Sequence, residues 1–120
     1  MRKLKIGSHR FTEIHAIDEP EFGANHIYCI SPIKRAPDAI VGEYSQVKFQ
    51  KGPIKEYGVN GCHNEDLLII VLDRLQSLNQ GKFACRENSL AITKIEEALH
   101  WLNHRTADRV KRGVEGTYEV

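Results

Sequence analysis

The sequence NEDLLIIVLDRLQSLN at residues 64–79 decides the fold, because its apolar residues recur at the spacing of a helix. Four of them share one helical stripe: Leu68, Val71, Leu72 and Leu75. Three more extend the apolar character to a second face: Leu67, Ile70 and Leu78. Asn64 offers an N-cap, and the two acids after it suit the positive end of a helix. We predict that Gly81 ends this helix.

Residues 85–111 predict a second, longer helix. Its apolar stripe is formed by Ala91, Ile95, Ala98 and Leu102, with Ile92 and Leu99 beside it. No proline or glycine interrupts the pattern before Gly113, so at about 1.5 Å per residue the helix would be roughly 40 Å long. The short link at 79–84 predicts that the two helices form an antiparallel hairpin.

The first part of the chain carries strand and turn patterns. Segments rich in β-branched and aromatic residues predict three short antiparallel strands, at 11–17, 26–30 and 44–50, with a possible edge strand at 4–6. The prolines and glycine of 32–43 indicate a loop.

We therefore expect an α+β fold. A small N-terminal antiparallel β-sheet occupies residues 1–57. A long antiparallel two-helix hairpin with a short C-terminal tail follows at 58–120, and both parts belong to one compact domain. The first helix is apolar over more than one face, which predicts a homo-oligomer. The alternative is that the sheet covers the second face.

Composition and charge narrow the function classes. The 120 residues include 17 basic and 16 acidic residues, a net charge of +1 that argues against a globally basic nucleic-acid binder. The three cysteines form no CxxC pair, so free thiols in a reducing cytosol fit better than a disulfide scaffold. The basic N-terminus lacks the apolar segment of a secretory signal, and the longest apolar run, 67–72, is too short to cross a bilayer.

Motifs for catalysis or metal binding are weak. His100 and His104 lie four residues apart, but Trp101 stands where a metalloprotease helix has glutamate, and no third ligand is identifiable. Cys85 lies at a helix start, where a thiolate is favoured, although cysteine is also a common buried apolar residue. We expect no metal site, no cofactor and no enzyme activity.

Two groups of residues suit an anionic nucleotide. Arg105, Arg109 and Arg112 fall on one stripe of the second helix, where guanidinium groups could bind phosphate or simply complement the helix dipole. Phe83, Arg86 and Asn88 join an aromatic ring, a cation and an amide at a loop-to-helix junction. The alternative for this second group is that Phe83 packs on the hairpin and Arg86 is solvated.

The sequence resembles the phage anti-Thoeris sponge family. The resemblance covers about residues 44–120 and is carried by four runs: FQKGPIKEYGVNG at 49–61, NEDLL at 64–68, FACREN at 83–88 and TKIEEALHWL at 93–102. The ending, at 105–109 and 113–117, matches as well. The helical hairpin is also similar to that of phage anti-CBASS cyclic-nucleotide sponges.

The resemblance implies a binding protein of the host bacterial cytoplasm that does no chemistry on its ligand. Such proteins hold the glycocyclic ADP-ribose signal of a Thoeris TIR-domain enzyme, assemble as dimers or hexamers, and in some members hold cyclic di- or trinucleotides at separate sites. It implies neither DNA nor a membrane as a partner. On this basis Arg109 and Arg112 would clamp phosphate, and Phe83 would stack on adenine. Arg105 would contribute to the positive electrostatic field around the phosphate or to packing.

Three further residues complete the expected site. Asn88 or Asn60 would read a base edge or a ribose hydroxyl, and Arg86 would serve a different pocket or another subunit. Two other function classes stay open: an enzyme that degrades the same signal, and a structural assembly protein whose arginines make only salt bridges.

Overall fold

The structure, a computed structural model, describes residues 1–6, 10–33 and 42–120. The predicted loop at 32–43 falls mostly on residues 34–41, which lie outside the described residues. The chain divides into two compact units, Met1–Cys62 and His63–Val120. The turn at 58–61, which we grouped with the helices, thus belongs to the first unit; the packing of both units as one domain stays a prediction.

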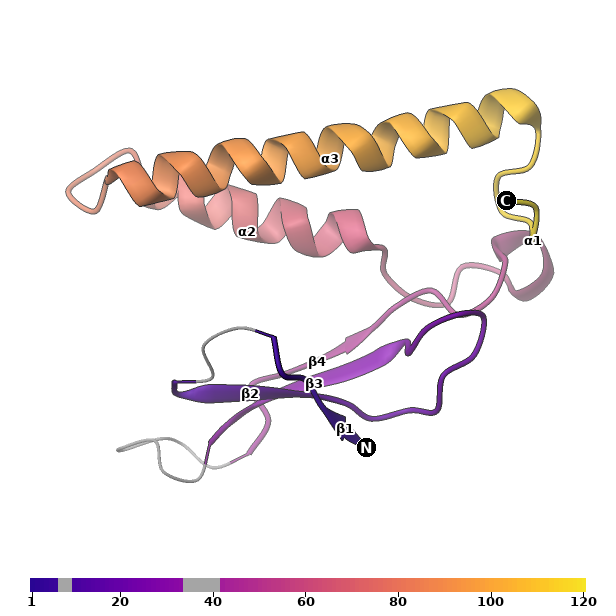
Figure 1. Cartoon of the computed structure of the whole chain (residues 1–120), viewed down its shortest axis with the longest axis horizontal. Coiled ribbons are helices and arrows are strands. Elements are labelled where there is room, and N and C mark those ends of the chain that lie inside the picture. Colours follow the sequence, from indigo (N-terminus) through magenta and orange to yellow (C-terminus); the bar gives the residue numbers. More distant parts are fainter. Residues whose placement is uncertain (7–9, 34–41) are drawn as a thin grey trace. The chain divides into compact units, whose positions relative to one another are not determined.

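The first unit is built on a four-stranded antiparallel sheet, as the sequence predicts (Figure 1). Its strands follow chain order: β1 (Arg2–Lys3), β2 (Thr12–Ala16), β3 (Ile27–Pro32) and β4 (Ser45–Lys48). Ile14 pairs with Ile30, and Tyr28 pairs with Val47. The predicted edge strand at 4–6 is wrong by a few residues, because the two ladder pairs of β1 involve Arg2 and Lys3.

A polar anchor holds the connection between β2 and β3. The Asp18 carboxylate accepts the backbone N–H groups of His26 and Ile27, at 3.0 and 3.2 Å, and the Asn25 side-chain amide at 3.1 Å. Asn25 is buried and also accepts a hydrogen bond from Arg2 in β1. Partial burial of Asp18 raises the pKa of its carboxyl group, whereas the hydrogen bonds to its ionised form lower that pKa. The hydrogen bonds together outweigh the burial, so the pKa of Asp18 lies below its usual value.

The segment after β4 is a compact, cross-linked loop. It contains a one-turn helix that the sequence analysis missed, α1 (Ile54–Tyr57), which starts directly after Pro53. Proline suits this N-cap position because its fixed φ, here −63°, is compatible with the start of a helix, and because it adds no N–H group that would lack a partner within the helix. At Gly61 a Cβ atom would lie 2.5 Å from the backbone carbonyl of Phe49, so only glycine allows this close approach.

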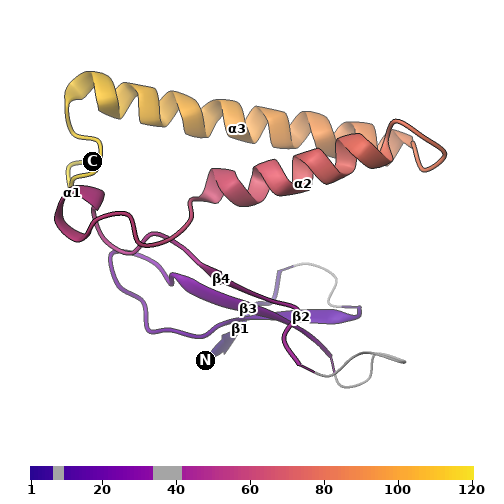
Figure 2. The same cartoon turned by 180° about the vertical axis from the view of Figure 1, so that it is seen from behind.

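The second unit is the predicted antiparallel hairpin of α2 (Asn64–Leu78) and α3 (Arg86–Arg112), shown from two sides in Figures 1 and 2. His63, and not Asn64, precedes the first turn of α2, and its N–H donates to the Asp66 carboxylate at 2.8 Å. The helix ends at Leu78, before the predicted stop at Gly81.

The two helices differ in length, and this leaves part of α3 without a helical partner. α3 has 27 residues against 15 in α2, so its C-terminal portion extends past the start of α2 (Figure 1). Val110, near the end of α3, is 62% exposed. Within the described residues, no helix is both long and apolar enough to span a membrane.

Candidate functional site

The turn of the hairpin presents an exposed aromatic ring. Phe83 is 62% exposed, and the Lys82 ammonium lies 5.2 Å from the centre of its ring. Asn79, at the end of α2, stabilises the turn. Its side chain accepts a hydrogen bond from the Cys85 N–H at 3.1 Å and donates one to the Ser89 hydroxyl at 3.0 Å. Phe83 therefore stands on a turn that is fixed by hydrogen bonds and is available for stacking.

Asn88 and Arg86 lie directly after this turn, in the first turns of α3. The Asn88 side chain donates to the Phe83 carbonyl at 3.2 Å, and its backbone N–H donates to the Cys85 sulfur at 3.4 Å. Asn88 thus orients the residue that carries the ring. Arg86 is exposed, and its guanidinium makes no hydrogen bond or ion pair within the part of the chain that is described.

The C-terminal arginines do not behave as one group. Arg105 is exposed, with no hydrogen bond or ion pair among the described residues, while Arg112 donates to the Asp108 carboxylate at 3.0 Å. The Arg112 side chain is still 47% exposed, and exposed pairs of this kind are worth about 0–1 kcal/mol. An anion could therefore recruit Arg105 directly and Arg112 at little cost.

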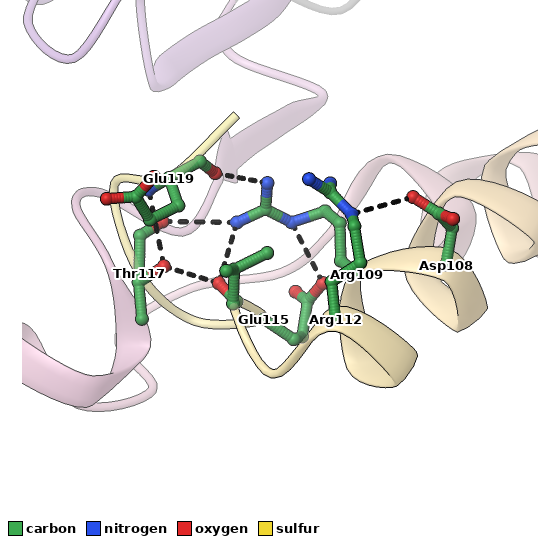
Figure 3. Close-up of polar contacts among 7 residues, drawn as sticks. Asp108, Arg109, Arg112, Glu115, Thr117 and Glu119 are labelled. Atoms are coloured by element: carbon green, nitrogen blue, oxygen red, sulfur yellow. Dashed lines mark hydrogen bonds and ion pairs between the residues drawn. The ribbon is translucent and has the colours of Figure 1, made fainter.

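Arg109 lies elsewhere: it is buried, at 5% exposure, and bound by the C-terminal tail (Figure 3). Its Nε donates to the Glu115 carboxylate at 3.1 Å, and one terminal nitrogen donates to the carbonyls of Val114 and Thr117. The other terminal nitrogen donates to the Glu119 carbonyl. Four of its five N–H groups are thus engaged. Arg109 is therefore not a free surface cation; its part in ligand binding stays a prediction.

A signal for this burial was present in the sequence. Arg109 lies seven residues after Leu102, so it continues the apolar stripe of α3 through Thr106, which is half-buried. The three arginines share a stripe about 60° wide, but only Arg109, at one edge of that stripe, falls on the line of the apolar residues. Arg105 and Arg112 both lie to the same side of that line.

Asn60 lies in the first unit, and both the oxygen and the nitrogen of its side-chain amide have local partners. Its side chain accepts the Lys51 N–H and donates to the Lys51 carbonyl, both at 2.8 Å, as a strand neighbour would. Its backbone N–H donates to the Gln50 side chain at 3.0 Å. These contacts brace the loop 50–60 and give Asn60 a structural function; a contact with ligand stays a prediction.

The candidate residues of the second unit form two separate groups within one chain. The turn group consists of Phe83, Arg86 and Asn88, and the end group consists of Arg105 and Arg112. Arg86 and Arg105 are 19 residues apart on a continuous helix, which is about 28 Å at 1.5 Å per residue. A ligand with one adenine and one pyrophosphate cannot bridge this distance.

The remaining candidates show local contacts only. His100 and His104 stack on each other beside Trp101, with ring centroids 6.5 Å apart. Across the described residues, no cluster of three or more histidine, cysteine or acidic side chains could hold a metal ion. Cys85 is exposed and caps α3, and Cys29 is buried in the sheet, where desolvation and the nearby Glu43 raise the pKa of its thiol.

Comparison with known proteins places these features in a family. The family model described as Acb2/Tad1, hairpin domain matches residues 43–107, more than half of the chain, and includes the whole turn group and Arg105. Thoeris anti-defense 1 of Bacillus phage SBSphiJ7 is 58% identical over 78 residues, which are 65% of this chain. The matched region spans 55% of that relative, so the chain covers only about half of its length. The matched residues contain β4, α2, the turn of the hairpin and most of α3. The chain belongs to the Acb2/Tad1 hairpin-domain family.

Proposed function

We propose that this chain is a phage anti-defence protein that binds and sequesters glycocyclic ADP-ribose, the signal of a Thoeris TIR-domain enzyme, without degrading it. The observation that carries the proposal is the 58% identity to a phage protein named for Thoeris anti-defence. The family model, matched over residues 43–107, covers the exposed Phe83 ring. We include cyclic di- or trinucleotides as ligands of separate sites. The site of action is the host bacterial cytoplasm.

The chemistry of the exposed groups suits this ligand. Adenine offers a flat ring to Phe83, and stacking of a base on an aromatic side chain is worth about 1–3 kcal/mol. The pyrophosphate offers oxygens to Arg86, Arg105 and Arg112, which can bind them as bidentate, charge-assisted partners. Asn88 holds the turn and can add a polar contact. In this proposal Asn60 supports the loop that precedes the hairpin.

The separation of the two groups favours a site shared between subunits. Nanomolar affinity corresponds to about −12 kcal/mol, which one stack and a few phosphate contacts reach only if the ligand is largely enclosed. One chain cannot enclose a small ligand with groups that lie about 28 Å apart on one helix. A second copy with its α3 antiparallel to the first would bring its end group to the turn group of its partner.

Exposed apolar side chains on α2 support assembly independently. Ile69, Ile70 and Val71 are 52%, 64% and 46% exposed within one chain. An unpartnered apolar surface of this kind is unusual in a protein that stays monomeric. We therefore propose a homo-oligomer, a dimer or a hexamer.

Sequestration requires binding and release of an unchanged molecule, and this separates it from the alternatives. The experiment incubates the protein with glycocyclic ADP-ribose, removes unbound ligand, denatures the protein by heat and analyses the released material by chromatography. A binding protein returns the intact ligand in a fixed ratio to subunits. An enzyme returns products in amounts that grow with time, and a structural protein retains no ligand after the wash.

A further inference from the structure

We infer that Arg109 is a positioning residue: it makes no contact with the ligand but holds the C-terminal tail, residues 113–119, folded against the end of α3 as part of the binding site. The binding part of this inference rests on the proposed function. The folding part does not, because it concerns contacts within the second unit alone.

The tail is shaped to return to the helix. Gly113 ends α3 in the left-handed conformation, at φ 75°, and its N–H donates to the Val110 carbonyl at 3.0 Å. The next N–H, of Val114, donates to the Arg109 carbonyl at 3.0 Å, which completes a Schellman motif. Gly116 adds a second positive φ, of 80°. The two glycines allow the chain to turn back, and residues 114–117 are half-buried.

The Arg109 guanidinium supplies the directed contacts that fix this tail (Figure 3). Its partners come from four positions spread along the tail: Val114, Glu115, Thr117 and Glu119. Three of the partners are backbone carbonyls, so the guanidinium defines the path of the main chain as well as the placement of one side chain. A leucine at this place in the apolar stripe would fill the space, but it would make no hydrogen bonds that fix the path of the tail.

The local charge opposes a direct role as a phosphate clamp. The Glu115 carboxylate already neutralises Arg109, at 3.1 Å from Nε, and only one of the five N–H groups is unused. A phosphate that bound here in bidentate fashion would have to displace Glu115 or break contacts with tail carbonyls. The exposed Arg105 and Arg112 offer phosphate the same chemistry without that loss.

The test compares two substitutions in the tail, each of which removes one negative charge and keeps the size of the side chain. Glu115→Gln removes the carboxylate that pairs with Arg109. Glu119→Gln is the matched control, because Glu119 reaches Arg109 through its backbone carbonyl and its carboxylate makes no hydrogen bond or ion pair with other described residues. For each variant, and for Arg109→Ala, we would measure amide hydrogen exchange of the tail and calorimetric affinity for glycocyclic ADP-ribose.

A positioning role predicts that Glu115→Gln and Arg109→Ala both weaken ligand binding, and that Arg109→Ala accelerates exchange of the Thr117 and Glu119 amides at least about tenfold. Glu119→Gln should stay within about twofold of the parent in both measurements. A direct clamp predicts the opposite sign for Glu115→Gln, a gain in affinity, because a competing carboxylate is removed. That gain would overturn the inference.

The remaining outcomes are also decisive. If Arg109→Ala leaves exchange of the tail unchanged, Arg109 does not hold the tail and the inference fails. If the tail is released but affinity is unchanged, the tail is not part of the site and the binding part fails. If Arg109→Ala does not fold, Glu115→Gln still shows whether the affinity for the ligand falls, as a positioning role predicts, or rises, as a direct clamp predicts. If the parent binds no glycocyclic ADP-ribose, the proposed function fails, while the exchange measurement still tests the tail.

Discussion

Substitution of Ile70 by glutamine tests whether α2 packs against a second copy of the chain. Ile70 is 64% exposed within one chain, and its neighbours Ile69 and Val71 are also largely exposed. An unpartnered apolar surface of this kind is unusual in a monomer. Glutamine has a helix propensity at least as good as that of isoleucine, so Ile70→Gln should leave α2 intact.

The expected magnitude follows from the area still exposed. Full burial of an isoleucine side chain contributes about 1.5–3 kcal/mol, and about two-thirds of this remains to be gained at Ile70, or about 1–2 kcal/mol. A two-fold interface contains the residue twice, so the dimer loses about 2–4 kcal/mol. At about 1.4 kcal/mol per decade, the dissociation constant should rise roughly 30-fold to several-hundred-fold.

Sedimentation velocity over a concentration series measures this constant, and circular dichroism checks that the helices persist. Gln76→Ala, on another side of the same helix, should leave the constant unchanged. Two results would refute the reasoning. In one, Ile70→Gln keeps the parent's mass at every concentration. In the other, it loses thermal stability without any change in mass, which would mean that the residue packs within its own chain.

Three further predictions concern the ligand, the sheet and the chemistry. Phe83→Ala should weaken binding of glycocyclic ADP-ribose by about 5-fold to 150-fold in calorimetry, with an unchanged melting temperature because the ring is exposed; Phe83→Tyr should bind like the parent. Asp18→Asn should melt earlier than the parent at neutral pH, and the gap should close as pH falls below about 4, because the lowered pKa of Asp18 means that its contribution is lost on protonation. A chelator and a reductant should leave ligand affinity unchanged, and a loss of affinity after chelation would indicate a metal at His100 and His104.

Local patterns explain why most of the fold could be predicted. The hairpin follows from the apolar periodicity of two helices and a short link, and each strand was found to within a few residues. The misses are short features. α1 is a single turn within a loop that the hydrogen bonds of Asn60 hold together. The cap at His63 depends on the side chain of Asp66, three residues later. Neither leaves a periodic signal in the sequence.

The candidate site divides in the same way between local and distant effects. The turn group could be predicted because its contacts, from Asn79 to Asn88, lie within ten residues of chain. The sequence suggests Asn60 as a reader of a base edge or a ribose hydroxyl, but it does not reveal that the fold pairs its side chain with the backbone of Lys51. In our proposal the end group meets a ligand only beside a second chain, and no pattern within one sequence carries that information.

Arg109 illustrates how charge periodicity can mislead. Three arginines at i, i+4 and i+7 suggest one cationic surface, yet the same spacing continues an apolar stripe that runs toward the tail. The stripe determines burial, since a residue on it faces what the helix packs against, and here that neighbour is the tail with its carbonyls and Glu115. A buried ion pair adds little net stability compared with apolar packing, so its benefit lies in fixing one conformation. The cation on the stripe therefore organises the chain, and the cations beside it remain exposed to an anion.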